Sequence, residues 1–175
     1  AKNTMHTLTQ EELCKLDSMN TFDELANLAI QTLERMRKSH QEIVQICGPM
    51  STGGGGNFQN NMERFNKSVE VALSRGVAVF NQVLFQTAII RICAWKEGQP
   101  YPTDLLEIFY RKVLSSGHIT KGLFLPDWQS SVGARWEWDF LSNQDIPVEH
   151  YPEAWMSEIL LEGDCCGQET ARSRS

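Results

Sequence analysis

The sequence predicts an α/β fold: a three-layer sandwich in which helices cover both faces of a mainly parallel sheet, preceded by an N-terminal helical arm. Short β-rich runs alternate with amphipathic stretches over residues 43–150, which is the pattern of successive βαβ units. The chain has 175 residues, 41% of them hydrophobic, so one domain can bury a core without disulfides. We expect an arm over 1–42, an α/β domain over 43–161 and a polar, disordered tail over 162–175.

The first half of the chain supplies the arm and one βαβ unit. Thr21 to Glu24 form a capping-box pattern, and apolar residues then recur at helical spacing as far as Met36. We expect this helix to be scaffolding, packed on the core or on a partner subunit. Residues 43–47 predict the first strand, 58–75 an amphipathic helix that Gly76 ends, and 77–80 the second strand.

The second half continues the alternation. Residues 82–95 are apolar and predict a loop with a buried helix, and 96–103 form a Pro/Gly-rich break. An amphipathic helix is expected over 104–115, a third strand over 123–125, a helix over 133–141 and a fourth strand over 146–148.

Charge and composition exclude several classes of protein. A net charge of −6 argues against binding a nucleic-acid polymer, which needs a basic face. No apolar stretch is long enough for a membrane span and no signal-peptide pattern is seen, so we expect a cytoplasmic protein that does not bind membranes. The five cysteines and four histidines lack metal-ligand spacing, so neither a metal nor another cofactor is expected.

A glycine-rich loop follows the first predicted strand. Ligands of open α/β sheets bind outside the carboxyl ends of the strands, and glycines leave the backbone N–H groups accessible there. A flexible connector would have the same composition. The candidate ligand-binding residues at the ends of the first two strands are Gly48, Pro49, Met50, Ser51, Gly53 and Asn81.

A second candidate site lies at the start of the helix predicted over 133–141. Glu137 is one turn into this helix, and helical side chains lean toward the N-terminus, so its carboxylate can point back at the preceding turn. Ser130, Ser131 and Gly133 could supply donors there, and Trp128 could stack on a nucleobase or pack in the core. A helical glutamate taken alone is more often a solvated surface group.

Three segments together resemble the nucleoside deoxyribosyltransferase superfamily, and in particular its small bacterial and bacteriophage branch. The resemblance covers about residues 43–150. The segments are ICGPMSTG at 46–53, VFNQ at 79–82 and LPDW…S.GA..E at 125–137, with Asp127 where the family has glycine.

The resemblance implies a flavodoxin-like fold and a homo-oligomer acting on a nucleotide or nucleoside. It makes Glu137 the nucleophile that attacks the anomeric carbon, forming a glycosyl-enzyme. Ser131, where transferases of free nucleosides have aspartate, implies a 5′-monophosphate substrate, because an aspartate would repel the phosphate. Asp104 and Glu107 are the candidates for the carboxylate that assists at the base.

We therefore expect an N-glycosidase or deoxyribosyltransferase that cleaves the N-glycosidic bond of a nucleoside 5′-monophosphate. Two alternatives stay open. The same pocket could bind a nucleotide without turnover, as a sensor or a sequestering protein. The chain could also be an interaction protein whose pocket is vestigial.

Overall fold

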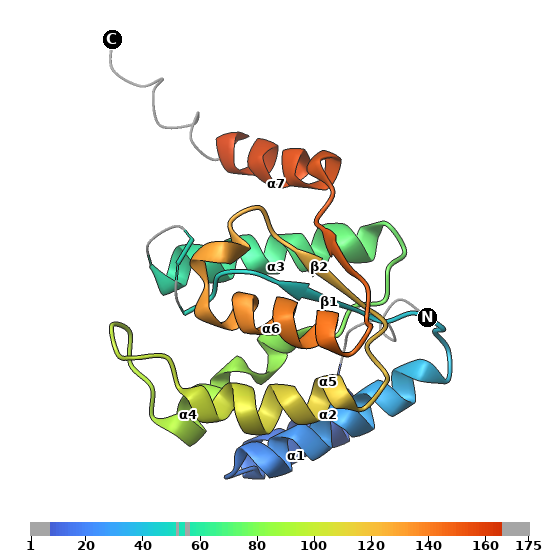
Figure 1. Ribbon diagram of the computed structural model, residues 1–175, viewed down its shortest axis with the longest axis vertical. Helices are drawn as coiled ribbons and strands as arrows, with labels where there is room; N and C mark the ends of the chain where they lie inside the picture. The colour runs from blue at the N-terminus through green and yellow to red at the C-terminus, as the bar shows by residue number, and fades with distance from the viewer. Residues whose placement is uncertain (1–7, 52, 55–56, 166–175) are drawn as a thin grey trace.

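The structure, a computed structural model, describes residues 8–51, 53, 54 and 57–165, with side chains as far as residue 160 (Figure 1). It confirms a mixed α/β fold with a parallel sheet. The strands are β1 (Val44–Cys47), β2 (Lys121–Phe124) and β3 (Val148–His150). The helices are α1 (Gln10–Ser18), α2 (Phe22–Arg37), α3 (Phe58–Ser74), η1 (Gln82–Phe85), α4 (Gln86–Cys93), η2 (Leu105–Tyr110), α5 (Arg111–Ser115), η3 (Trp128–Ser130), α6 (Val132–Asn143) and α7 (Glu153–Cys165).

The sheet has the order β1-β2-β3, and both pairs are parallel. Val44 pairs with Lys121 and Cys47 with Phe124. The strand predicted over 77–80 is reduced to one parallel bridge, in which Val79 lies beside Val44 on the outer side of β1. The backbone around Val79 makes only two hydrogen bonds to Val44, both of 2.9 Å, so the segment extends the sheet without forming a full strand.

The last strand begins two residues later than the pattern at 146–148 predicts. Pro147 has no N–H and so cannot donate to a ladder. Its carbonyl still accepts from Gly122 at 3.0 Å, and regular pairing starts at Val148.

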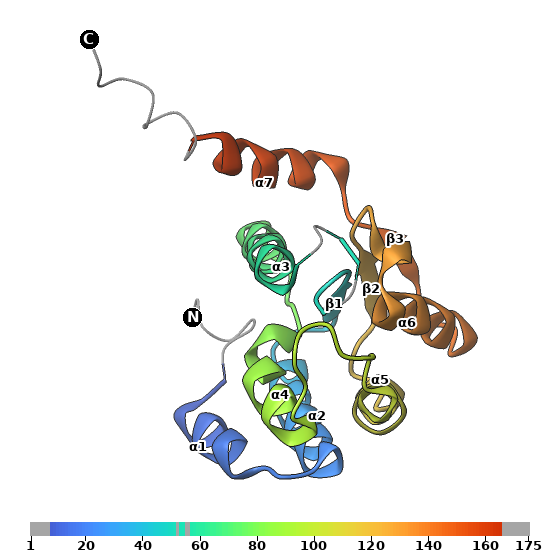
Figure 2. The same ribbon diagram turned by 90° about the vertical axis from the view of Figure 1, so that its left-hand side faces the viewer.

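Helices cover both faces of the sheet, and each face has its own apolar cluster. Residues alternate between the faces, as the period of a strand requires: Val44 and Ile46 of β1 belong to the cluster of α3 and α7. Cys47 of β1 belongs to the larger cluster, which α1, α2, α4, η2, α5 and α6 complete. Figure 2 shows α3 and α6 on opposite sides of the strands.

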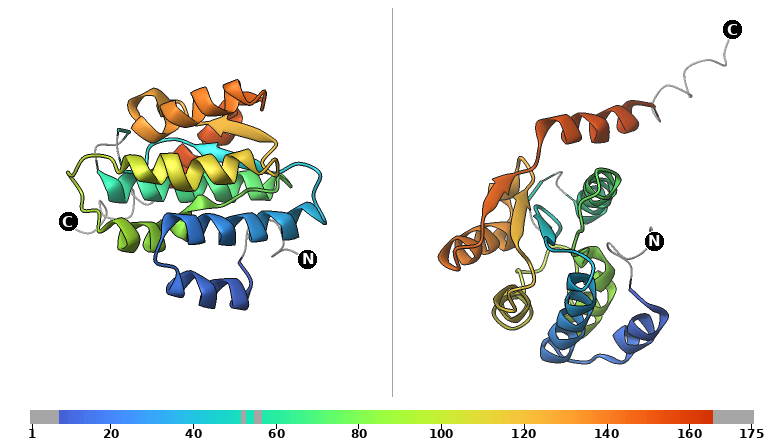
Figure 3. Two further views of the ribbon diagram at one scale, coloured as in Figure 1. Left: turned by 60° about the horizontal axis from the view of Figure 1, so that its bottom comes forward. Right: turned by 90° about the vertical axis from the view of Figure 1, so that its right-hand side faces the viewer.

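The helices expected to form an arm are part of the larger cluster. Leu25 and Leu33 of α2 are fully buried, and they share that cluster with Phe124 of the sheet. A partly buried ion pair holds α1 on α2, because Glu12 accepts from Arg35 at 2.8 Å and from Thr32 at 3.1 Å. Figure 3 shows α1 lying along the outer side of α2.

The C-terminal helix α7 packs on α3. The Tyr151 hydroxyl donates to the Ser68 carbonyl at 2.8 Å, and Arg75 pairs with Glu158. The helix continues to Cys165, so it includes the first residues of the tail predicted over 162–175, and the rest of that tail lies outside the described residues. Among the described residues, no helix combines the length and the apolar content that crossing a membrane needs.

We predict that Leu33→Ala lowers the free energy of unfolding by about 2–5 kcal/mol, because it leaves a cavity in a fully buried position. Urea denaturation measures this change. Leu13→Ala on α1 is the matched control: Leu13 is 41% exposed, so its loss should change stability by less than about 0.5 kcal/mol. A separate early transition for the N-terminal helices in the parent protein would contradict their place in the common core.

Candidate functional site

Glu137 lies on the buried stripe of α6 and faces the sheet. The helix starts at Val132, and Ser131 is its N-cap, because the Ser131 hydroxyl accepts from the N–H of Ala134 at 3.2 Å. The inward positions of the helix are Gly133, Ala134, Glu137 and Leu141. Only 5% of Glu137 is exposed, so the interpretation as a solvated surface carboxylate is wrong.

Two side chains of β1 hold the Glu137 carboxylate. Gln45 Nε2 and Cys47 Sγ both donate to Glu137 Oε2, the thiol at 3.0 Å. Both side chains come from the same face of β1 because they are two residues apart. The buried carboxylate of α6 is therefore hydrogen-bonded to β1.

Burial dominates the electrostatics of this group. Removal from water raises the pKa of Glu137 to about 7, although the hydrogen bonds from Cys47 and Gln45 oppose the shift. Burial and the neighbouring Glu137 charge raise the pKa of the Cys47 thiol well above its usual value. The same two causes raise the pKa values of Tyr101 and Tyr110. At neutral pH, Glu137 is thus partly ionised among groups that keep their protons.

A small cavity connects Glu137 to the glycine-rich loop. Six of the predicted site residues line it: Gly48, Met50, Ser51, Ser131, Gly133 and Glu137. The wall is completed by residues that the sequence analysis did not identify: Gln82, Gln86, Tyr101, Leu105, Tyr110 and Ala134. Its volume is about 30 Å³, which is space for water but not for a nucleotide.

At Gly48 and Gly133, neighbouring side chains lie too close to the backbone to leave room for a Cβ atom. A Cβ on Gly48 would lie 2.6 Å from Leu125 Cδ1, so the ends of β1 and β2 could not approach this closely. A Cβ on Gly133 would lie 2.8 Å from the Tyr101 hydroxyl oxygen. These glycines therefore allow the strand ends and Tyr101 to close around the cavity.

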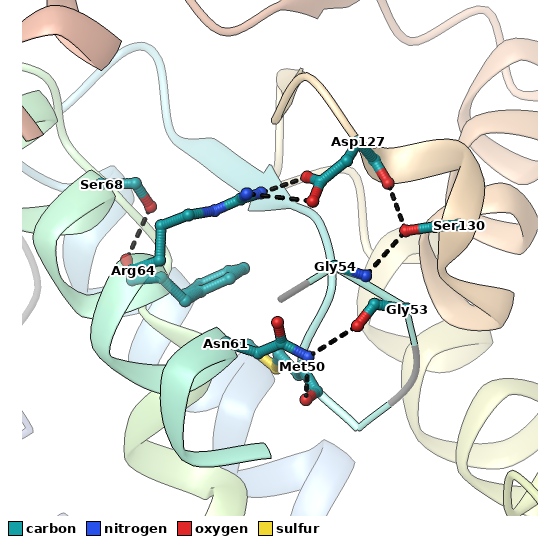
Figure 4. A network of polar contacts seen from close by, with 9 residues as sticks. Met50, Gly53, Gly54, Asn61, Arg64, Ser68, Asp127 and Ser130 are labelled. Atoms are coloured by element: carbon teal, nitrogen blue, oxygen red, sulfur yellow. Dashed lines mark hydrogen bonds and ion pairs between the residues drawn. The ribbon is translucent and has the colours of Figure 1, made fainter. Parts of the chain in front are cut away.

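A polar network fixes the glycine-rich loop to its surroundings (Figure 4). Asn61 of α3 donates to the carbonyls of Met50 and Gly53 at 3.1 and 3.0 Å. The N–H of Gly54 donates to Ser130 Oγ at 2.9 Å. Ser130 is thus engaged in holding the loop, and this N–H of the loop is already satisfied.

The same network includes an ion pair between α3 and the end of β2. Arg64 donates to both carboxylate oxygens of Asp127, with Nη1 at 2.9 Å from Oδ2. The Asp127 carbonyl accepts from the Ser130 hydroxyl at 2.6 Å. Figure 4 shows these contacts side by side with those of Asn61, so the loop is held from both α3 and η3.

The structure does not bring the expected assisting carboxylates to the cavity. Asp104 and Glu107 are exposed, and neither lines the cavity of Glu137. Glu107 points outward, where it pairs with Arg111 at 2.7 Å and accepts from Trp136 at 3.4 Å. The amphipathic helix turns its apolar side to the core, and both acids therefore face solvent.

Three further predicted residues lie beside the cavity without lining it. Asn81 accepts from the Val83 N–H at 3.2 Å and caps η1, and its neighbour Gln82 lines the cavity instead. Trp128 stacks on Trp138 with ring centroids 4.4 Å apart, so one face of its indole is used in packing. Pro49 is buried between its neighbours and is absent from the lining.

One of the functional residues missed by the sequence analysis had a signal. Gln45 is the one strongly polar side chain in the apolar strand 43–47, and it is fully buried. Such a residue needs a polar partner inside the core.

Gln82 and Tyr110 form a second buried pair, in which Tyr110 donates to Gln82 and Gln82 Nε2 donates to the Ile46 carbonyl at 2.7 Å. No pattern in the sequence indicates that pair.

Neither similarity to known proteins nor a metal site indicates the function of this chain. Comparisons with protein families, curated proteins and solved structures give no match for this chain. Within the part of the chain that the structure describes, no three His, Cys, Asp or Glu side chains gather as metal ligands would. The chemistry must therefore be argued from the Glu137 cavity itself.

We predict that Glu137→Gln stabilises the protein at pH 8 but not at pH 5. The folded-state pKa of about 7 lies above the usual 4.5, so the folded protein binds more protons in this window and the parent loses stability as pH rises from 4.5 to 7. The loss amounts to about 3 kcal/mol above pH 7. Glutamine keeps an oxygen for both donors without the charge.

Urea denaturation at pH 5 and pH 8 measures the effect. Glu107→Gln is the matched control, since Glu107 is exposed and its substitution should leave the pH dependence unchanged. A difference between parent and Glu137→Gln that stays constant over this range would contradict the raised pKa.

Proposed function

We propose that this chain cleaves the N-glycosidic bond of a nucleoside 5′-monophosphate, by hydrolysis or by transfer to another base, with Glu137 as the nucleophile. The observation that carries the proposal is the Glu137 cavity. It combines a buried, partly ionised carboxylate with the glycine-rich loop and the Ser131 turn at one end of the sheet. A buried carboxylate that lines a cavity and has a strongly shifted pKa is a candidate functional group.

The topology supports a three-layer domain of the flavodoxin-like, deoxyribosyltransferase type. With the bridge at Val79 included, the parallel order is Val79-β1-β2-β3, which corresponds to the first four positions of the flavodoxin order. In such sheets the ligand binds beyond the carboxyl ends of the strands, where the order reverses. Gly48 and Met50 follow β1 directly, so the cavity is at that place.

In the proposed reaction, a carboxylate oxygen of Glu137 forms a bond to the anomeric carbon as the bond from that carbon to the base nitrogen breaks. The electron pair of the broken bond leaves with the base, which takes a proton from solvent water. A water molecule, which loses a proton to the solvent, or a second base then displaces Glu137 from the sugar. Tyr101 makes no hydrogen bond among the described residues and keeps its proton, so it is our candidate for the group that hydrogen-bonds the departing base.

Ser131 is suited to a phosphate. Its oxygen accepts from Ala134, which leaves the hydroxyl hydrogen free to donate to an anion. It lines the cavity and lies at the N-terminus of α6, where the helix dipole favours negative charge.

Substrate entry requires the wall near Tyr101 to move, because the cavity is small. A neighbouring apolar cavity of about 20 Å³ shares three lining residues with the Glu137 cavity: Ser51, Gln86 and Leu105. Tyr101 also lines an outer groove of about 550 Å³. Displacement of Tyr101 would join the Glu137 cavity to the outer groove, because Tyr101 lines both. Ala94 and Gly98, both at positive φ, precede Tyr101 in a segment without regular structure.

Binding of a nucleotide without turnover is the second candidate. It is favoured by the absence of a partner acid: among the described residues that line the cavity, Glu137 is the sole carboxylate. A glycosidase usually has a second group to manage protons. A protein that binds the nucleotide without cleaving it would not need such a second group.

We predict that the protein releases free base from at least one ribo- or deoxyribonucleoside 5′-monophosphate, measured by chromatography across a panel of bases. Glu137→Gln should abolish release and keep binding, because it removes the nucleophile without changing the shape of the side chain. In the parent, kcat should increase as pH rises through about 7, since the ionised form attacks.

Glu107→Gln is the control, and it should release base like the parent. Release that survives Glu137→Gln would overturn the nucleophile. Binding of a monophosphate by the parent without any release would favour the sensor.

We predict that Ser131→Asp shifts preference from the monophosphate to the free nucleoside. Aspartate is an equally good N-cap, so α6 should keep its start. Its charge repels the phosphate, and the ratio of kcat/KM for the monophosphate to that for the nucleoside should fall by about 100-fold. Ser142→Asp is the matched control, since Ser142 is exposed on the same helix and lies outside the cavity lining. An equal loss of kcat/KM for both substrates would argue against a phosphate contact.

A further inference from the structure

We infer that Gln45 and Cys47 are positioning residues that hold Oε2 of Glu137 and leave Oε1 as the oxygen that attacks the substrate. The inference deepens the proposed function and rests on it. It assigns separate tasks to the two oxygens of one carboxylate, and it gives a reason for two buried hydrogen-bond donors on β1.

The geometry places both donors on the same atom. Gln45 Nε2 and Cys47 Sγ each contact Glu137 Oε2, whereas no described residue donates to Oε1. Both side chains are fully buried, and Glu137 lines the cavity. The anchored oxygen is therefore on the side of the sheet, and the oxygen without a protein partner is available to the cavity.

Two donors from a strand restrict the carboxylate more than one donor would. A single hydrogen bond lets the group rotate about its last torsion, which is soft for glutamate. Two donors that meet at one oxygen from positions 45 and 47 fix both the place and the plane of the carboxylate. A nucleophile held in this way needs little reorganisation on the path to the transition state.

The groups around Glu137 are neutral at pH 7, so the Cys47 thiol keeps the proton that it donates to Glu137. The titratable groups that interact with Glu137 are Cys47 on β1, Tyr101 in the segment before η2, and Tyr110 on η2. All three have raised pKa values, so they are neutral at pH 7. The described lining holds no Lys or Arg that would compensate the Glu137 charge. Hydrogen bonds to Oε2 are thus the main opposing influence to burial.

The Cys47 pair of variants tests this role. Cys47→Ala removes the donor, and Cys47→Ser replaces it with a hydroxyl donor of similar size. We expect Cys47→Ala to raise the pKa of Glu137 by about one unit, because it removes a hydrogen bond to the ionised form. Cys47→Ser should restore the parent pKa to within a few tenths. The carboxyl carbon signals of labelled glutamate, followed by NMR over pH 4–9, report the pKa without any substrate.

The kinetic arm uses base release from the monophosphate that the parent cleaves. Cys47→Ala and Gln45→Met should each lower kcat about tenfold with little change in KM, and raise the pKa of the acidic limb of the rate profile. Cys47→Ser should recover most of kcat. Cys14→Ala, at an exposed cysteine of α1, is the control and should match the parent in both arms.

Equal loss of kcat in Cys47→Ala and Cys47→Ser, with an unchanged Glu137 pKa, would overturn the inference, because it would show a packing role only. Absence of base release from every variant would refute the proposed reaction, and with it the attack by Oε1. The NMR arm separates these failures: a raised pKa in Cys47→Ala alone would show that the two donors anchor a carboxylate that binds but does not react.

Discussion

The burial of the Glu137 carboxylate against β1 is the constraint on which the site depends. A carboxylate in the apolar core costs free energy in its ionised form, so the fold must supply donors at that point. Gln45 and Cys47 supply them from a strand that is otherwise apolar. Glycine at position 48 lets the ends of β1 and β2 close together, and glycine at position 133 makes room for Tyr101. Removing the charge would stabilise the core and abolish the proposed reaction, as expected where activity and stability oppose each other.

The residues that line the Glu137 cavity are different from those that hold the glycine-rich loop in place. The cavity wall consists of backbone at the strand ends and of buried side chains, whereas the half-exposed ion pair of Arg64 and Asp127 lies behind the glycine-rich loop. Such pairs add little to stability when solvated. Their contribution here is positional, because Asn61 and Ser130 fix the loop within the same network. Asp127 has a local partner in Arg64, which pairs with both of its carboxylate oxygens.

Sequence periodicity was sufficient for the larger elements, and a local motif indicated three residues that line the Glu137 cavity. The helix at 133–141 and the strand at 43–47 follow from apolar spacing, and Glu137 with Ser131 and Gly133 follows from a local motif. Asp104 and Glu107 were placed wrongly because one-dimensional spacing does not say which face of a helix meets the cavity. Tyr101 and Tyr110 could not be found, because they reach Glu137 through tertiary packing across distant segments. Trp128 shows that an aromatic residue beside a motif can be used by the core.

The stacked indoles of Trp128 and Trp138 have a practical consequence. Their planes are nearly parallel, at 6°, and they join η3 to α6 on either side of Ser131. Two chromophores in such contact couple optically, and they separate if the start of α6 shifts. Trp138 also lies 5.8 Å from the His150 ring on β3. The chain thus contains an intrinsic spectroscopic reporter, and near-ultraviolet circular dichroism can follow the junction that bears the serine and the glutamate without any attached label.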